Sequence, residues 1–348
     1  MERIDVGQKT IDKVQVHKGL TNKFVFKQDN KVYFFKENEK TSMDLGNDIA
    51  EVLSVYFFKK VGYKNFVNYE LAQDGNSAIG VICESFISDD VICEKNFAEL
   101  MTLYLYQQKY GKKYDITSKF TEKQLEKVEH GLDAIIRGEN YNSIEFAIDI
   151  VKRVCKSCGV AFDEHKVEKD LLKMSILDFF MSDCDRHSYN LEFLFKKNGD
   201  KIYCELTPSF DHGCAFGIRN YWLDISKGML PNIASYYYPA IGISKHSQIY
   251  RVENDEIVED GGLFVRELMQ KIEKDRELSD LFKRCREVDI QECIKDFNEK
   301  ESAKISEMLA EHIIQTYNQR LSMVETQERE MKKAGNIKNK KEGKDKIE

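Results

Sequence analysis

DCDRHSYN at residues 183–190 places two polar side chains, Asp185 and Asn190, five positions apart. The stretch follows residues 168–182, whose apolar side chains cover nearly the whole circumference of a predicted helix, as expected for a helix in the middle of a lobe. A carboxylate and an amide at this spacing can divide two tasks of phosphoryl transfer. The carboxylate accepts the proton of an attacking hydroxyl, and the amide oxygen holds a metal ion on the phosphates. We assign the first task to Asp185 and the second to Asn190.

A hairpin and a second acidic loop follow this stretch. Residues 191–195 and 201–206 flank KNGD at 197–200, in which Asn-Gly is a strong hairpin-turn signal. The hairpin returns the chain to FDHG at 210–213, and we expect Asp211 to be a ligand of the same metal ions. An Asp and an Asn five apart often arise by chance and then only cap a turn. The buried helix, the hairpin and Asp211 in this order favour the chemical interpretation.

The N-terminal part contains groups that such a site needs to bind a nucleotide. Short aromatic or β-branched segments predict strands at residues 13–17, 23–27, 31–36, 68–72 and 78–82. A helix is predicted from about residue 48 to Gly62, because apolar residues recur at helical spacing and glycine is a normal C-terminal signal. Lys36 ends the third strand, and Glu51 lies on the inner face of the helix. A lysine that binds the α- and β-phosphates needs a glutamate to position it, so we expect Lys36 and Glu51 to pair.

Together these motifs resemble the HipA-like serine/threonine kinases, especially their small stand-alone CtkA type. The resemblance rests on residues 185–190, on LTPSFDHG at 206–213 and on the helix from DIAE at residue 48 to Gly62. It extends from about residue 13 to the final helix, and residues 89–165 are the least similar part. It implies a bilobal protein-kinase-like fold of the α+β class with ATP and magnesium between the lobes. It also implies phosphorylation of serine or threonine, often including self-phosphorylation.

The resemblance and a change of pattern after Phe86 predict three parts of the chain. Residues 1–87 are expected to form a small antiparallel β N-lobe with the Glu51 helix, and residues 88–328 a larger, mainly helical C-lobe with the catalytic and metal-binding loops. An amphipathic helix over residues 305–324 closes this lobe. Residues 329–348 hold seven lysines and almost no apolar side chain, so we expect a disordered, solvated tail.

Further nucleotide contacts are predicted at two places in the small lobe. HKGLTNK at 17–23 has one glycine where phosphate-covering loops usually have more. We expect Gly19, Thr21 and Asn22 to bind phosphate there, the last two through their side chains. Glu84 and Phe86 lie where the chain leaves the small lobe, so their backbone groups are candidates for reading the adenine edge.

His187 lies two residues after the predicted base. Kinases of the eukaryotic type carry a lysine there that neutralises the transferred phosphoryl group, and we assign His187 the same catalytic task; the alternative is a histidine that only hydrogen-bonds within the loop. No His-Arg pair precedes Asp185. Control through an arginine that reads a phosphorylated activation loop is therefore not expected.

Composition limits the remaining functions. The 53 Lys and Arg residues against 60 Asp and Glu residues give a net charge of −7, which argues against a surface that binds nucleic acid beyond weak contacts of the basic tail. No apolar run reaches the roughly 18 residues that span a bilayer, and the first residues lack a signal core. We expect a cytoplasmic protein, with secretion as an effector left open.

Three functions stay open at this point. The first is a serine/threonine protein kinase that acts on a protein substrate and has an antitoxin-like or other regulatory protein as a possible partner. The second is a lipid or small-molecule kinase, since the loops at 185–190 and 210–213 also resemble phosphatidylinositol 3- and 4-kinases. The third is a pseudokinase that binds nucleotide and acts through a partner.

Overall fold

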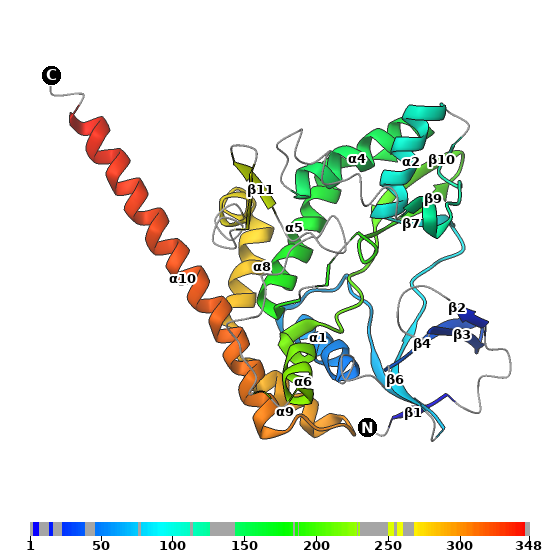
Figure 1. Ribbon diagram of the computed structural model, residues 1–348, viewed down its shortest axis with the longest axis horizontal. Coiled ribbons are helices and arrows are strands. Elements are labelled where there is room, and N and C mark those ends of the chain that lie inside the picture. The colour runs from blue at the N-terminus through cyan, green and yellow to red at the C-terminus, as the bar shows by residue number, and fades with distance from the viewer. Residues whose placement is uncertain are drawn as a thin grey trace.

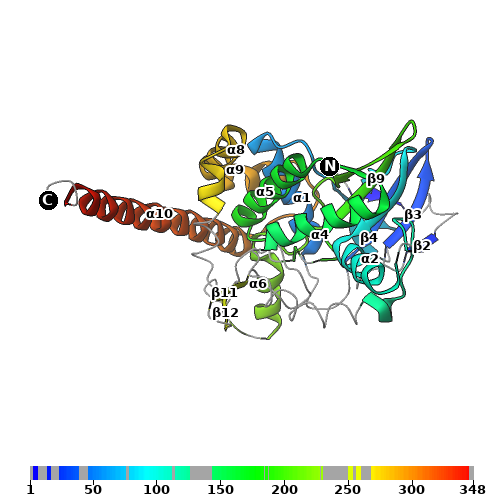
Figure 2. The same cartoon turned by 90° about the horizontal axis from the view of Figure 1, so that it is seen from above.

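The computed structural model contains two main β-sheets, a body of helices beside them and a long C-terminal helix that extends away from the body (Figures 1 and 2). It describes residues 3–6, 14–16, 23–38, 46–75, 78–111, 114–125, 143–183, 185–186, 188–227, 229, 250–253, 256–259 and 268–344. Among these residues, no helix combines the length and the apolar character that crossing a membrane requires.

The first sheet is formed by the N-terminal part of the chain. Its strands in spatial order are β1 (Ile4–Asp5), β5 (Glu70–Asp74), β6 (Ala78–Glu84), β4 (Lys31–Glu37), β3 (Lys23–Gln28) and β2 (Val14–Val16). The β1–β5 pair is parallel and the other pairs are antiparallel. Asp29 and Asn30 both have positive φ, which matches a two-residue hairpin turn between β3 and β4. The predicted small antiparallel sheet is therefore confirmed.

Helix α1 (Asn47–Val61) follows this sheet in the chain and ends at Gly62, whose φ of 69° is the left-handed conformation expected after a helix. Most of the helix is buried, and it shares the large hydrophobic core with Leu71 and Val81 of the sheet and with the helices of the C-terminal part. The other face of the sheet has a small core of its own, formed by Val6, Phe26, Phe35, Ala72 and Ile82. Helix α1 thus lies between the sheet and the helical body.

The second sheet has the order β7 (Val91–Asn96), β9 (Glu192–Asn198), β10 (Lys201–Leu206) and β8 (Ala161–Phe162). The predicted hairpin is present, because β9 and β10 pair from Asn198 and Lys201 onward and Gly199 in the turn has a φ of 60°. We did not predict β7 or β8. Strand β7 (VICEKN) mixes apolar and polar residues and β8 has only two residues, so neither shows a strand pattern, and pairing with β9 and β10 decides their conformation.

Helices make up most of the C-terminal part, in agreement with the predicted α+β fold. They are α2 (Phe97–Tyr110), α4 (Ser143–Cys158), α5 (Glu164–Met181), α6 (Ile218–Ser226), α8 (Arg276–Glu287), α9 (Ile290–Lys300) and α10 (Glu307–Lys344), with a short 3₁₀ turn η1 (Ala215–Gly217) and a separate hairpin of β11 (Tyr250–Glu253) and β12 (Glu256–Glu259). The domain boundary at residue 87 stays a prediction.

Helix α10 corrects the expectation of a disordered tail from residue 329. The helix begins at Glu307 and continues to Lys344, so it includes most of the lysine-rich segment (Figure 1). Adding one more residue to an existing helix costs little, because each new residue gains a hydrogen bond, and Lys, Glu and Ala all favour the helix. A segment with few apolar side chains can therefore extend a helix whose first half buries one face against the body.

His312 gives a test of how α10 is held against the body. Its Nε2 lies 3.2 Å from the carbonyl oxygen of Gly217, its ring contacts Tyr221, and burial lowers its pKa. Because the unfolded chain then binds a proton at higher pH than the folded chain, stability falls as the pH drops below about 6.5. We expect His312→Gln, which keeps a donor and cannot titrate, to lose less stability between about pH 7 and about pH 5, measured by urea unfolding. Equal losses of stability in the wild type and in His312→Gln would show that protonation of His312 does not weaken the folded chain.

Candidate active site

The catalytic loop begins where α5 ends. Ser182 ends the helix with a φ of 53°, and the N–H of Asp183 donates to the carbonyl of Asp178 at 2.9 Å. Beyond this turn Asn190 Nδ2 donates to the carbonyl oxygen of Asp185 at 2.8 Å. Because the nitrogen of this planar amide is used within the loop, the amide oxygen faces away from that bond. The loop therefore presents the Asn190 oxygen and the partly exposed Asp185 carboxylate as oxygen ligands or proton acceptors.

The loop with Asp211 is held by residues that precede β5. Val67 donates its N–H to the carbonyl of Ser209 at 2.9 Å, and Ser209 donates its N–H to the carbonyl of Asn65 at 2.9 Å. Asp211 itself has a φ of 60°, a left-handed conformation that costs most residues roughly 1 kcal/mol or more but is less unfavourable for Asp and Asn. Such strain persists only where several contacts fix the backbone.

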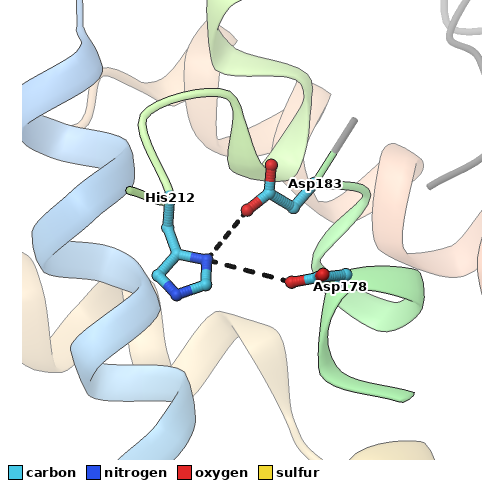
Figure 3. Close-up of side chains that lie close together, drawn as sticks. All are labelled: Asp178, Asp183 and His212. Carbon is cyan, nitrogen blue, oxygen red and sulfur yellow. Dashed lines mark hydrogen bonds and ion pairs between the residues drawn. The ribbon is translucent and has the colours of Figure 1, made fainter. Parts of the chain in front are cut away.

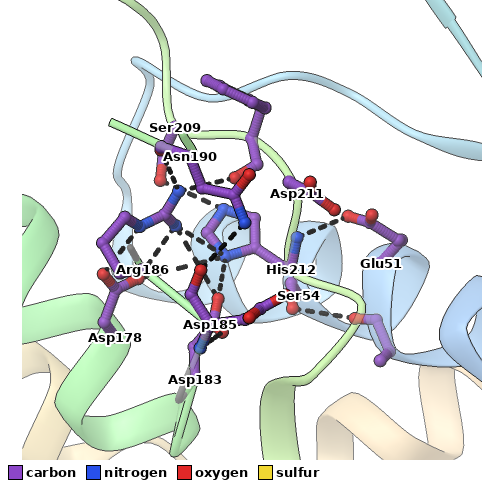
Figure 4. A network of polar contacts seen from close by, with 12 residues as sticks. Glu51, Ser54, Asp178, Asp183, Asp185, Arg186, Asn190, Ser209, Asp211 and His212 are labelled. Carbon is purple, nitrogen blue, oxygen red and sulfur yellow. Dashed lines mark hydrogen bonds and ion pairs between the residues drawn. The ribbon is translucent and has the colours of Figure 1, made fainter. Parts of the chain in front are cut away.

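Lys36 joins the small sheet to both α1 and the Asp211 loop. Its Nζ donates to Glu51 Oε1 at 2.8 Å and to Asp211 Oδ1 at 2.5 Å. The second oxygen of Glu51, Oε2, accepts the backbone N–H of His212 at 2.8 Å (Figure 4). These contacts close a ring of groups from β4, α1 and the loop after β10. The predicted contact between Lys36 and Glu51 is present, and Asp211 lies against the same ammonium group.

The charges in this ring set the ionisation of its members. Burial opposes the ionisation of Asp211, but the charges of Lys36 and Lys23 outweigh it and hold the pKa of that carboxyl well below its usual range. Burial also opposes the ionisation of Lys36 and by itself would lower its pKa. The carboxylates of Asp211 and Glu51 outweigh this effect and raise the pKa of Lys36 well above its ordinary value. Both groups are therefore charged at neutral pH. An ionised Asp211 is the form that binds a divalent cation.

Arg186 connects the catalytic loop to the Asp211 loop. It is 1% exposed and forms a bidentate pair with Asp178, with Nε to Oδ2 at 3.0 Å and Nη2 to Oδ1 at 3.1 Å. Its Nη1 donates both to the carbonyl of Asn190 at 3.1 Å and to the carbonyl of Phe210 at 2.8 Å (Figure 4). A single nitrogen atom thus fixes the backbone at Asn190 and the backbone directly before Asp211. This contact brings the backbone at the two predicted metal-binding residues close together.

His212 makes a second buried connection between the loops. Its Nδ1 lies 2.8 Å from Asp183 Oδ2, and its Nε2 lies 3.0 Å from Ser209 Oγ. Burial, together with the charge of Arg186, lowers the pKa of His212 to about 4, so the ring is neutral at pH 7. The arrangement fits a ring that donates to Asp183 and accepts from Ser209. Asp183 Oδ1 accepts the N–H of Asp185 at 3.2 Å, which extends the connection to the predicted base.

Asp178, Asp183 and His212 lie close enough to one another to bind a metal ion (Figure 3). The Arg186 guanidinium already supplies the positive charge there, with its Nη2 3.1 Å from Asp178 Oδ1 and 3.3 Å from His212 Nδ1. A metal cation at the same place would repel this buried guanidinium, which carries its charge at any pH of interest. We therefore assign this cluster a structural role. The residues that fit magnesium are Asn190 and Asp211, whose amide and carboxylate oxygens are the donors this ion prefers.

The other predicted binding residues lie at the edge of the site or outside the described residues. Glu84 ends β6, and its carboxylate forms an exposed ion pair with Lys31 at 2.7 Å. The ring of Phe86 packs against Phe210, with centroids 6.1 Å apart, so the segment that leaves the small sheet lies next to the Asp211 loop. Gly19, Thr21, Asn22 and the predicted catalytic residue His187 lie outside the residues that the structure describes.

We did not predict roles for Asp178, Asp183, Arg186 or His212. One signal was available in the sequence, because Asp178 is a lone carboxylate in an otherwise strongly apolar stretch of α5. A charged residue at such a position is rarely buried without a partner. The partner of Asp178 is Arg186, eight positions later in the sequence.

Comparison with known proteins gives a match at the level of structure. No family model matches the chain, and no curated protein matches it. The crystal structure of the Helicobacter pylori proinflammatory kinase CtkA superposes with a TM-score of 0.53 at 16% sequence identity, over 91% of this chain and 94% of that chain. The chain has a CtkA-like kinase fold. A chain of the Shewanella oneidensis MR-1 toxin–antitoxin complex of HipA, HipB and operator DNA aligns over 89% of this chain and 64% of its own length, with 13% identity and a TM-score of 0.40.

This CtkA-like fold accounts for the arrangement of the site. The lysine comes from the small sheet, the glutamate from the helix that follows it, and the two loops with Asp185 and Asp211 from the larger part. Glu51 and Asp211, which are far apart in the sequence, therefore meet at Lys36. Most of the chain takes part in the similarity, since it covers 91% of the residues.

Proposed function

We propose that the chain is an ATP-dependent phosphotransferase, and specifically a HipA/CtkA-like serine/threonine protein kinase that also phosphorylates itself. The observation that carries this proposal is the position of Lys36, whose ammonium contacts both Glu51 and Asp211. Such a lysine is available to bind the phosphates of a nucleotide, with Glu51 to orient it and Asp211 beside it to bind metal. The CtkA-like fold supports the proposal.

In the proposed reaction, the residues of the two loops have separate tasks. Asp185 accepts the proton of the acceptor hydroxyl as its oxygen forms a bond to the γ-phosphorus, and the bond from that phosphorus to the ADP oxygen breaks. Lys36 holds the phosphates that remain on ADP. Asn190 and Asp211 would hold magnesium, which neutralises the negative charge of the phosphates. His187 is proposed to neutralise charge on the transferred group.

The acceptor and the partners form the finer part of the proposal. A serine or threonine hydroxyl of a protein is the proposed acceptor, and a protein regulator of the antitoxin type is a proposed partner. The proposed location is the cytoplasm. Nucleotide contacts by Gly19, Thr21, Asn22, Glu84 and Phe86 are proposed on their positions in the sequence.

The test is transfer of label from γ-labelled ATP by the full-length chain with magnesium. Three acceptors are compared: the chain itself, a general protein substrate, and vesicles that contain phosphatidylinositol. We expect label on serine or threonine of protein, and none when a chelator removes the metal. Label in the lipid extract alone would support the lipid-kinase alternative. Nucleotide binding without transfer to any acceptor would instead support a pseudokinase.

A further inference from the structure

The C-terminal end of helix α1 is held by the larger lobe. Arg284 of α8 donates from Nε to the carbonyl oxygen of Val61, the last residue of α1, at 2.6 Å. The last carbonyls of a helix have no partner within the helix, and a cation there also interacts favourably with the helix dipole. On the preceding residue, Lys60 forms ion pairs with Glu292 at 3.1 Å and with Asp296 at 3.6 Å, both on α9.

Another contact to the larger lobe is made by Tyr56, five positions after Glu51. The Tyr56 hydroxyl donates to Glu301 Oε1 at 2.7 Å, and Glu301 is the buried residue that directly follows α9. Burial and the bond to Glu301 raise the pKa of Tyr56, so the hydroxyl remains a donor across the physiological range. The Tyr56 ring also packs edge-on against Phe297 of α9, with centroids 6.0 Å apart. A hydrogen bond to a buried carboxylate is among the stronger polar contacts in proteins.

The opposite side of α1 faces the small sheet and has fewer polar contacts among the described residues. Lys36 pairs with Glu51, and Arg3 beside β1 pairs with Asp48 at 2.6 Å. Leu71 and Val81 of the sheet add apolar contacts in the core that they share with α1. Apolar contacts are non-directional, so they allow a helix to turn about its axis more readily than directional hydrogen bonds do. The rotational position of α1 is therefore set by its bonds to α8 and to the segment at and after α9, together with the bond of Glu51 to the His212 N–H in the loop after β10.

We infer that Arg284, Tyr56 and Glu301 are positioning residues for the Lys36–Glu51 pair, because they fix α1 on the larger lobe with Glu51 turned toward Lys36. The effect of this positioning on catalysis rests on the proposed function. A rotation of α1 that withdrew Glu51 from Lys36 would have to break the bonds at Val61 and Tyr56 as well as the bond of Glu51 to the His212 N–H. The Lys36–Glu51 pair is then held in place by contacts within the chain itself.

The experiment compares the wild-type chain with Arg284→Ala, Arg284→Lys and Tyr56→Phe. Lys283→Ala is the matched control, since Lys283 lies on the same helix but is 72% exposed, and its ion pair with Glu287 is long, at 3.9 Å. Hydrogen exchange of the amides of α1 and of the β3–β4 hairpin is measured first, because it needs no turnover. KM for ATP and kcat are then measured separately.

For Arg284→Ala and Tyr56→Phe we expect amide exchange in α1 to become about tenfold faster while exchange in β3–β4 stays at the wild-type rate. We also expect kcat/KM for ATP to fall about tenfold, with partial recovery in Arg284→Lys and no change in Lys283→Ala. A general loss of stability would instead accelerate exchange in α1 and β3–β4 together, and that result would overturn the inference. Unchanged exchange in α1 would overturn it as well.

The two readouts separate this inference from the proposed function. If the wild-type chain transfers no phosphate to any acceptor, the proposed function fails. The exchange rates of α1 still decide whether α8 and α9 hold the helix. If the wild-type chain is active and α1 exchanges faster in the variants while kcat/KM stays unchanged, the positioning role is refuted although the contacts are real.

Discussion

Asp211→Asn is expected to reduce phosphoryl transfer by about a hundredfold to a thousandfold while the chain stays folded. The substitution removes the negative charge that would bind metal and that now pairs with Lys36 at 2.5 Å. Asparagine is the suitable replacement, because residue 211 has a φ of 60° and asparagine tolerates this left-handed conformation better than most residues. Transfer from labelled ATP and the far-UV circular dichroism of both proteins are the measurements.

Glu94→Gln serves as the control for removing a carboxylate elsewhere, because Glu94 lies on β7 and the second sheet, away from the ring around Lys36. We expect this variant to keep wild-type activity. Asp185→Asn should resemble Asp211→Asn in turnover but should leave the Lys36–Asp211 ion pair intact, so its thermal stability should stay close to that of the wild type. Full activity in Asp211→Asn would remove the basis of the proposed function.

Arg186→Met is expected to lower the free energy of unfolding by about 3–5 kcal/mol. The substitution leaves the carboxylates of Asp178 and Asp183 buried without their guanidinium partner, and both are nearly or fully inaccessible to solvent. It also removes the donor shared by the carbonyls of Asn190 and Phe210. Urea unfolding with midpoint and slope gives the change directly.

Arg153→Met is the matched control, since Arg153 forms an exposed pair with Asp149 at 2.7 Å and such pairs contribute at most about 1 kcal/mol. The double variant Arg186→Met/Asp178→Leu tests the cause. Replacing both partners by apolar residues should recover part of the lost stability, because a buried charge is removed. It should not recover phosphoryl transfer, because the two loops still lack the arginine that joins their backbones. Equal unfolding midpoints for Arg186→Met and the wild type would show that the buried pair is not needed for stability.

Local signals in the sequence were sufficient for the elements that carry the site. The Asn-Gly turn predicted the β9–β10 hairpin, and Gly62 predicted the end of α1, because both depend on backbone conformations that few residues adopt. The apolar segment before Asp183 predicted the buried helix α5. The CtkA-like similarity confirms the kinase-like fold inferred from these motifs, whereas the acceptor, the cofactors and the roles of the single residues remain proposals.

The sequence did not predict two elements, strand β7 and the C-terminal part of α10, because their local sequences are ambiguous. Strand β7 has mixed polar residues and becomes a strand through pairing with β9. The lysine-rich segment after residue 329 has no apolar pattern, and it is helical as an extension of α10. In both cases a neighbouring element decides the conformation, and sequence patterns of a short window do not report that neighbour.

The sequence by itself determined which chemical groups are present and which of them lie at loop positions: Lys36 at the end of a strand, Glu51 on a helix, and Asp185, Asn190 and Asp211 in two loops. Only the tertiary structure decided how these loops are held together, through a buried guanidinium at residue 186 that contacts both. The physical reason is that hydrogen bonds between distant segments depend on burial and direction, and neither property is encoded in the spacing of residues along the chain.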